Sequence, residues 1–140
     1  MNVDFFMKEA IIEADKAYNL NEVPVGGILV DNTTNKIVAR SYNKVNKDKN
    51  AIKHCELNLI QETCERLKLK YLENMTLFVT LEPCTMCASA ISGYILKMYI
   101  LGLMMKKMEA LKNSELLFKE KIYLCQLFMV ELWKKNVVIY

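Results

Sequence analysis

The spacing of apolar residues along the chain predicts alternating helices and strands. Apolar side chains recur about every 3.6 residues over residues 5–18, which predicts a helix with one buried stripe and Asp4 as its N-cap. A continuous apolar run at residues 25–30 predicts a buried strand, and a polar turn then leads into a second strand at residues 36–42. These two strands are expected to form a hairpin. Residues 43–53 are polar and basic and are expected to form a loop.

The middle of the chain repeats this alternation. A second helix is expected to begin near His54, and residues 76–81 read as a third strand. Pro83 is expected to open a third helix that ends near Gly93, because the first helical turn leaves the N–H that proline lacks unpaired in any case. The largely apolar run at residues 97–101 is expected to form a fourth strand. Because a helix joins the third and fourth strands, they should be parallel with a right-handed crossover.

This order of elements predicts an α/β fold, a three-layer α/β/α sandwich around one mixed sheet. The length of 140 residues fits a single domain over residues 1–140. Residues 106–119 fit a helix. Residues 122–128 fit a fifth strand and equally a helix that continues through Trp133, since periodicity does not separate the two for a short apolar run.

Composition narrows the class of protein. Hydrophobic residues make up 53% of the chain and charged residues 25%, with only 4 Gly and 2 Pro, which excludes disordered and collagen-like chains. No apolar run reaches the length of a membrane span, and the N-terminus does not read as a secretory signal. The five cysteines are an odd number, which argues against a disulfide framework and for a reducing compartment. We therefore expect an intracellular protein, in the cytoplasm or the nucleus, with no membrane contact.

Positive charge is concentrated locally although the net charge is only +3. Residues 36–53 hold six basic residues and one acidic residue, whereas residues 1–35 hold two basic and six acidic residues. A basic segment of this kind suits an anionic partner such as a nucleic acid, and it equally fits solvated surface lysines. Phosphate contacts from Lys44 and Lys47 would position a strand without reading its sequence.

The single histidine begins the most informative pattern in the chain. His54 and Glu56 form an H-x-E motif, and a P-C-x-x-C motif follows, with 26 residues between Glu56 and its proline. His54, Cys84 and Cys87 supply three zinc ligands, so a tetrahedral ion keeps one position open for water, which is the catalytic rather than the structural pattern. A helix N-terminus beside both cysteines is expected to lower the pKa of their thiols and favour zinc-binding thiolates.

Glu56 lies two positions after His54 and can reach the ion without binding it. Such a carboxylate can take a proton from zinc-activated water and return it to a ring nitrogen and a leaving amine. The alternative for Cys84 and Cys87 is a thioredoxin-type redox pair. Redox chemistry needs no H-x-E motif, however, so the presence of both motifs favours the metal site.

The two motifs resemble the signature of zinc-dependent nucleoside and nucleobase deaminases. The sequence is further similar to tRNA adenosine deaminases in Glu-Val-Pro-Val-Gly at residues 22–26, in residues 80–88 and in Asn43. The run at residues 43–51 resembles the catalytic subunit of the eukaryotic heterodimeric enzyme more closely than it resembles the bacterial form. That eukaryotic enzyme makes inosine at the wobble position of the anticodon. Cys55 departs from the family, which usually has alanine there, and we expect it to be a small buried residue.

The resemblance implies a cytidine-deaminase-like fold and a Zn²⁺-dependent hydrolase that converts adenosine to inosine in tRNA. Hydroxide would attack C6 of a flipped-out adenine and ammonia would leave. Asn43 would reach the target base through its amide. The partners implied are tRNA and a second deaminase subunit, in a homodimer or a heterodimer. The apolar, Met-rich residues 103–108 replace polar residues that hold RNA in the family, so they fit an interface with that subunit.

Two alternatives remain at this point. The first is a deaminase of a free base or nucleoside such as cytosine or guanine, which the basic segment at residues 36–53 disfavours. The second is a zinc-binding, non-catalytic subunit, which the proton-shuttle glutamate Glu56 disfavours.

Overall fold

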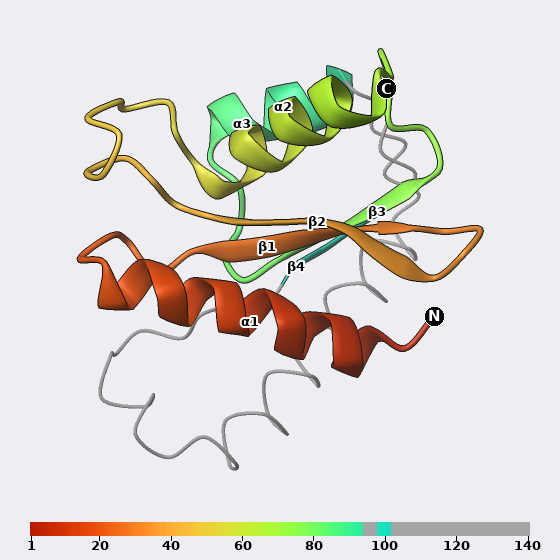
Figure 1. Cartoon of the computed structure of the whole chain (residues 1–140), viewed down its shortest axis with the longest axis horizontal. Coiled ribbons are helices and arrows are strands. Elements are labelled where there is room, and N and C mark those ends of the chain that lie inside the picture. The colour runs from red at the N-terminus through yellow and green to blue at the C-terminus, as the bar shows by residue number, and fades with distance from the viewer. Residues whose placement is uncertain (94–97, 102–140) are drawn as a thin grey trace.

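The computed structural model describes residues 1–93 and 98–101, and Figure 1 shows how their helices and strands are arranged. The elements in chain order are α1 (Val3–Asn19), β1 (Gly26–Asp31), β2 (Lys36–Tyr42), α2 (Cys55–Leu67), β3 (Met75–Val79), α3 (Thr85–Gly93) and β4 (Met98–Leu101). The predicted order of helices and strands is confirmed. The expectations for residues 103–140 lie outside the described residues.

The four strands form one mixed sheet in the order β2-β1-β3-β4. β1 pairs antiparallel with both β2 and β3, and β3 pairs parallel with β4, as a helical crossover requires. Figure 1 shows α1 on one face of the sheet and α2 and α3 together on the other. The predicted α/β/α sandwich is confirmed.

Strand β1 is apolar and buried from its first residue to Val30, because both of its faces are covered. Ile28 and Val30 pack with Phe78 and the buried face of α1. Leu29 points to the opposite side and packs with Leu59 of α2 in the second core cluster. Each layer of helices therefore has its own apolar core, and the β1 side chains alternate between the two.

Helix α1 lies unusually close to β1, and Gly26 permits this approach. A Cβ atom at Gly26 would lie 2.1 Å from the backbone nitrogen of Ala14 and 2.5 Å from the carbonyl oxygen of Ala10. Gly26 also bonds the chain after β3: its N–H donates to Thr80 Oγ1 at 3.1 Å and its carbonyl accepts from the Thr80 N–H at 3.0 Å. These bonds hold the start of β1 beside the segment that leads to Cys84.

Several element boundaries differ from the sequence predictions by a residue or two, and the differences at α1, β3 and α3 follow from specific contacts. Helix α1 begins at Val3 with Asn2 as its N-cap, because the Asn2 side chain accepts the Phe5 N–H at 3.1 Å. Asp4 instead lies in the first turn, where a negative charge also suits the helix dipole. Strand β3 ends at Val79, since Thr80 turns to bond Gly26, and α3 begins at Thr85 rather than at the preceding proline. No helix among the described residues is long and apolar enough to cross a membrane.

Candidate metal and catalytic site

The starts of α2 and α3 bring the three predicted metal ligands together. His54 is the N-cap residue of α2, Cys84 directly precedes α3, and Cys87 lies in the first turn of α3. His54 Nδ1 lies 3.7 Å from Cys84 Sγ and 3.5 Å from Cys87 Sγ, and the two sulfurs are 3.7 Å apart. Two helices that start side by side on one face of the sheet thus place one imidazole and two thiols around a common point.

These distances fit a zinc ion. Zn–S bonds of about 2.3 Å and Zn–N bonds of about 2.0–2.1 Å in a tetrahedron place neighbouring ligand atoms roughly 3.5–3.8 Å apart. The three separations in the structure lie between 3.5 and 3.7 Å, so an ion fits without movement of the side chains. The set supplies three ligands, which leaves a fourth position for water or substrate. This is the donor set that the sequence predicted.

The pKa of the Cys87 thiol differs from the value that the sequence led us to expect. Burial raises the pKa of Cys87, and the nearby Glu56 carboxylate raises it further, so the expected lowering by the helix N-terminus is not seen here. Loss of solvent around the sulfur is the largest cause, because burial disfavours the charged thiolate. A metal cation reverses this balance, because it binds the thiolate and displaces the proton.

Glu56 lies beside the ligands in the first turn of α2. Its side chain is buried, with 4% of its surface exposed, and it hydrogen-bonds the Cys87 thiol. Burial raises the pKa of Glu56, while its own backbone N–H and His54 act in the opposite direction. A carboxyl group with a raised pKa, next to a metal position, is suited to accept a proton and to return it.

Asn43 holds the start of α2, a role that sequence reasoning missed. Its backbone N–H donates to the carbonyl of Val25 at 3.0 Å, and its Oδ1 accepts the Cys55 N–H at 2.9 Å. The N-cap residue His54 makes no capping bond with its own side chain. Asn43 therefore caps the helix from the preceding loop and leaves the imidazole available for a metal.

The two lysines predicted to contact substrate differ in their surroundings. Lys44 Nζ forms an ion pair with Glu62 at 2.9 Å and lies 5.6 Å from the centre of the Tyr42 ring. Burial opposes the charge of Lys44, but the hydrogen bond and the charge of Glu62 raise its pKa overall. Lys47 is exposed on the loop, and its backbone N–H donates to Glu22 at 2.7 Å. Lys47 is thus available to an anion as the structure stands, whereas Lys44 first has to leave Glu62.

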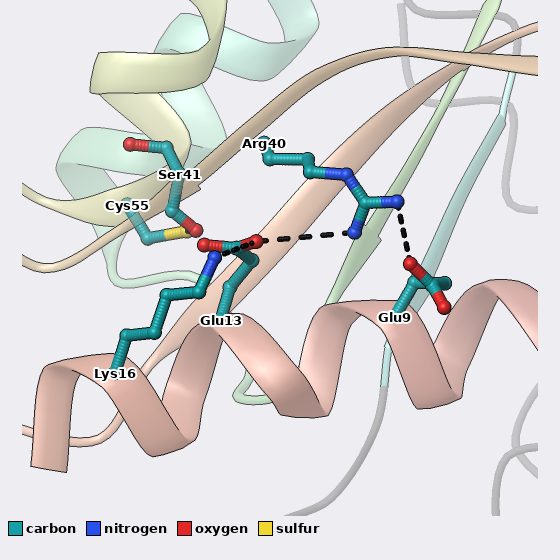
Figure 2. A network of polar contacts seen from close by, with 6 residues as sticks. All are labelled: Glu9, Glu13, Lys16, Arg40, Ser41 and Cys55. Atoms are coloured by element: carbon teal, nitrogen blue, oxygen red, sulfur yellow. Dashed lines mark hydrogen bonds and ion pairs between the residues drawn. The ribbon is translucent and has the colours of Figure 1, made fainter.

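Cys55 is fully buried, as the sequence predicted, and it is separate from the metal ligands. Its thiol donates to the Ser41 carbonyl at 3.3 Å, and burial raises its pKa well above the usual value. Figure 2 shows it beside a charged network in which Glu13 binds Lys16 at 2.7 Å and Arg40 at 3.8 Å. This network joins α1 to β2 and is structural.

Comparison with known proteins agrees with this geometry. Residues 1–103 match the family model described as the cytidine and deoxycytidylate deaminase zinc-binding region. The tRNA-specific adenosine deaminase of Rickettsia bellii is 39% identical over 115 residues, covering 82% of this chain and 79% of that protein. The tRNA-specific adenosine deaminase of Bacillus subtilis is 47% identical over 88 residues, covering 63% of this chain and 53% of that protein.

Two solved structures share the fold. One comes from work on A-to-I editing by tRNA:A34 deaminases at the wobble position, with a TM-score of 0.67 and 39% identity over 70% of this chain and 74% of that chain. The other is guanine deaminase from Bacillus subtilis, with a TM-score of 0.68 and 28% identity over 72% of this chain and 64% of that chain. The expected closer likeness to the eukaryotic catalytic subunit is not confirmed by these proteins. The chain belongs to the zinc-binding cytidine and deoxycytidylate deaminase family, among relatives of the bacterial tRNA-specific adenosine deaminases.

Proposed function

We propose that this protein is a zinc-dependent hydrolase that deaminates adenosine to inosine in tRNA, at the wobble position of the anticodon. The observation that carries the proposal is the spacing of His54, Cys84 and Cys87, at 3.5–3.7 Å from one another, with the buried Glu56 carboxylate beside them. The substrate is inferred from the relatives, which are named tRNA-specific adenosine deaminases.

In this mechanism His54, Cys84 and Cys87 hold the ion. A bound Zn²⁺ supplies a Lewis acid and lowers the pKa of water. Glu56 takes one proton from the attacking water and delivers it to a ring nitrogen of adenine, and it then moves the remaining proton of the new C6 hydroxyl to the amine, which leaves as ammonia as the C6 carbonyl forms. The raised pKa of Glu56 suits both halves of this transfer, because the group must accept a proton and then release it.

Substrate contacts are assigned to Asn43, Lys44 and Lys47, which lie at the start of the loop at residues 43–53. The Asn43 side chain binds the Cys55 N–H through Oδ1, and its amide nitrogen is a donor that can bond an acceptor on the purine edge. Lys47 is exposed and can contact a phosphate, which would fix the position of the RNA without reading its sequence. Lys44 would also contact a phosphate once its ion pair with Glu62 opens.

A second deaminase subunit, identical or related, belongs to the same proposal. It is motivated by the apolar residues 103–108, which are expected to form an interface. An intracellular location also follows from the proposed substrate.

Deamination of a free base is the competing function. The guanine deaminase of Bacillus subtilis has a similar fold at 28% identity, so guanine is the free base to test. The basic loop at residues 43–53 favours RNA over a neutral base, because a free base has no phosphate for lysines to contact.

The test compares substrates on the zinc-loaded protein. An anticodon stem-loop with adenosine at the wobble position, free adenosine, guanine and cytosine are incubated with the protein, alone and with a candidate partner subunit. Inosine in the stem-loop, with a rate that falls steeply as salt rises, is the expected result, since phosphate contacts release counterions. Turnover of guanine with an unchanged stem-loop would show that the protein is a free-base deaminase instead.

A further inference from the structure

Glu22 is a buried acidic residue far in sequence from the metal ligands. It lies between α1 and β1, and only 5% of its surface is exposed. Its two carboxylate oxygens accept the N–H groups of two consecutive loop residues, Asn46 at 3.1 Å and Lys47 at 2.7 Å. Among the described residues it forms no ion pair, so these loop amides are what compensate the burial of its charge.

The position of Glu22 is itself fixed by the end of α1. Its N–H donates to the Ala17 carbonyl at 3.0 Å, and the neighbouring Asn21 N–H donates to the Tyr18 carbonyl at 3.1 Å. The Asn46 side chain returns a hydrogen bond to the Asn21 carbonyl at 2.8 Å. Three bonds therefore connect the tip of the loop to a rigid helix end.

The other end of this loop is the candidate active site. The Lys44 N–H donates to the Lys53 carbonyl at 3.0 Å, which closes the base of the loop between Asn43 and His54. The basic side chain of Lys47 is exposed at the tip. Since a phosphate contact requires a lysine in a defined place, the conformation of the tip decides whether Lys47 can position an RNA strand.

We propose that Glu22 is a positioning residue for RNA binding, which holds residues 43–53 in the conformation that presents Lys47 to the phosphate backbone. This inference rests on the proposed function, because it takes RNA as the substrate. Glu22 does not contact the metal ligands in the structure and acts only through the backbone of the loop.

The proposal is testable because replacing Glu22 by glutamine should weaken RNA binding if Glu22 positions the loop, whereas the change in charge alone should strengthen it. Glu22→Gln removes a negative charge from under a basic loop, so simple electrostatics predicts tighter RNA binding. It also turns an amide N–H₂ toward a backbone N–H, which cannot bond it and loosens the tip. If Glu22 positions the loop, RNA binding becomes weaker in spite of the added net positive charge.

The experiment measures the Kd of the anticodon stem-loop at several salt concentrations, with KM, kcat and zinc content in parallel. For Glu22→Gln we expect Kd and KM to rise about tenfold, the usual scale for a lost charge-assisted hydrogen bond. We expect kcat and zinc content close to those of the unchanged protein. The slope of log K against log salt should fall by about one, because one phosphate contact is lost.

Glu13→Gln is the matched control, since Glu13 is also buried and the charge change is the same. Its partners Lys16 and Arg40 lie on α1 and β2 (Figure 2), and neither of them belongs to the loop at residues 43–53. We expect this variant to bind RNA as the unchanged protein does. Asn46→Ala removes only the returning bond to Asn21 and should weaken binding in the same direction by a smaller factor, and it serves as the test if Glu22→Gln loses the fold.

Equal or tighter stem-loop binding by Glu22→Gln, with the fold intact, would overturn the inference. If the unchanged protein binds the stem-loop but does not deaminate it, the proposed function fails and the Kd values still decide the role of Glu22. A protein that binds no RNA overturns both.

Discussion

Replacement of Gly26 by alanine is expected to destabilise the fold through the α1 layer. The new Cβ would lie 2.1 Å from Ala14 N and 2.5 Å from the carbon and oxygen atoms of two other α1 backbone groups. Ordinary carbon contacts need about 3.5 Å, so α1 has to move by more than about 1 Å against a packed core. Overpacking usually costs about 1–3 kcal/mol. We expect about 3 kcal/mol, because the obstacle is helix backbone, which cannot rotate away.

Urea unfolding measures this cost directly. With an m-value of about 2 kcal/mol/M, the midpoint of the Gly26→Ala variant should fall by more than about 1 M. Gly93→Ala is the matched control, because no atom of the described residues lies within 4 Å of a Cβ at Gly93, the last residue of α3. The control should be neutral or more stable by less than about 1 kcal/mol. Equal unfolding midpoints for the Gly26 variant and the unchanged protein would refute the close approach of α1 to the sheet.

Three further outcomes follow from the site and its surroundings. Cys84→Ala and Cys87→Ala should each lower the zinc content measured by atomic absorption, because the described residues gather only three ligands for the ion and each change removes one of them. Full zinc occupancy after both changes would contradict the site. Glu62→Gln should tighten stem-loop binding a few-fold by releasing Lys44, and should change the free energy of unfolding by less than about 1 kcal/mol because the pair is partly exposed; unchanged affinity would exclude Lys44 from RNA contact. Two backbone N–H groups of the hairpin turn lower the pKa of Asp31, so the stability that its carboxylate adds is present above its ordinary pKa near 4 and is lost as the pH falls through its lower folded value. The urea unfolding midpoints of Asp31→Asn and the unchanged protein should therefore converge at low pH. A difference that stays constant with pH would contradict this.

Much of the fold could be predicted because each element has a periodic apolar pattern. The stripe of α1 and the continuous run of β1 identify a helix on a strand with two covered faces. The partner of a strand is not encoded in the same way: the antiparallel pairing of β1 with β3 follows from long-range packing. The sequence also does not decide between Asn2 and Asp4 as the N-cap of α1, because either residue type caps a helix well.

The metal ligands could be predicted because their spacing is fixed by zinc chemistry and by two helix starts. The supporting contacts could not, because hydrogen bonds from side chain to backbone leave no period in the sequence. Asn43 caps α2 across 12 residues and Glu22 holds the loop across 24 and 25 residues. Glu22 belongs to the Glu-Val-Pro-Val-Gly run that resembles the tRNA adenosine deaminases, but that resemblance does not show which groups its carboxylate binds, and its burial appears only in three dimensions.

The most direct test of the central claim is inosine formation in an anticodon stem-loop by the zinc-loaded protein and by its Glu56→Gln variant, with any partner subunit that activity requires. Glu56→Gln keeps the shape of the side chain and the three ligands, so it should retain zinc and the fold. It should lose at least about 10²-fold in rate, the usual scale for a general acid–base group. The account predicts inosine at the wobble position with the unchanged protein and almost none with the variant. Near-equal rates for the two proteins at equal zinc content would contradict it.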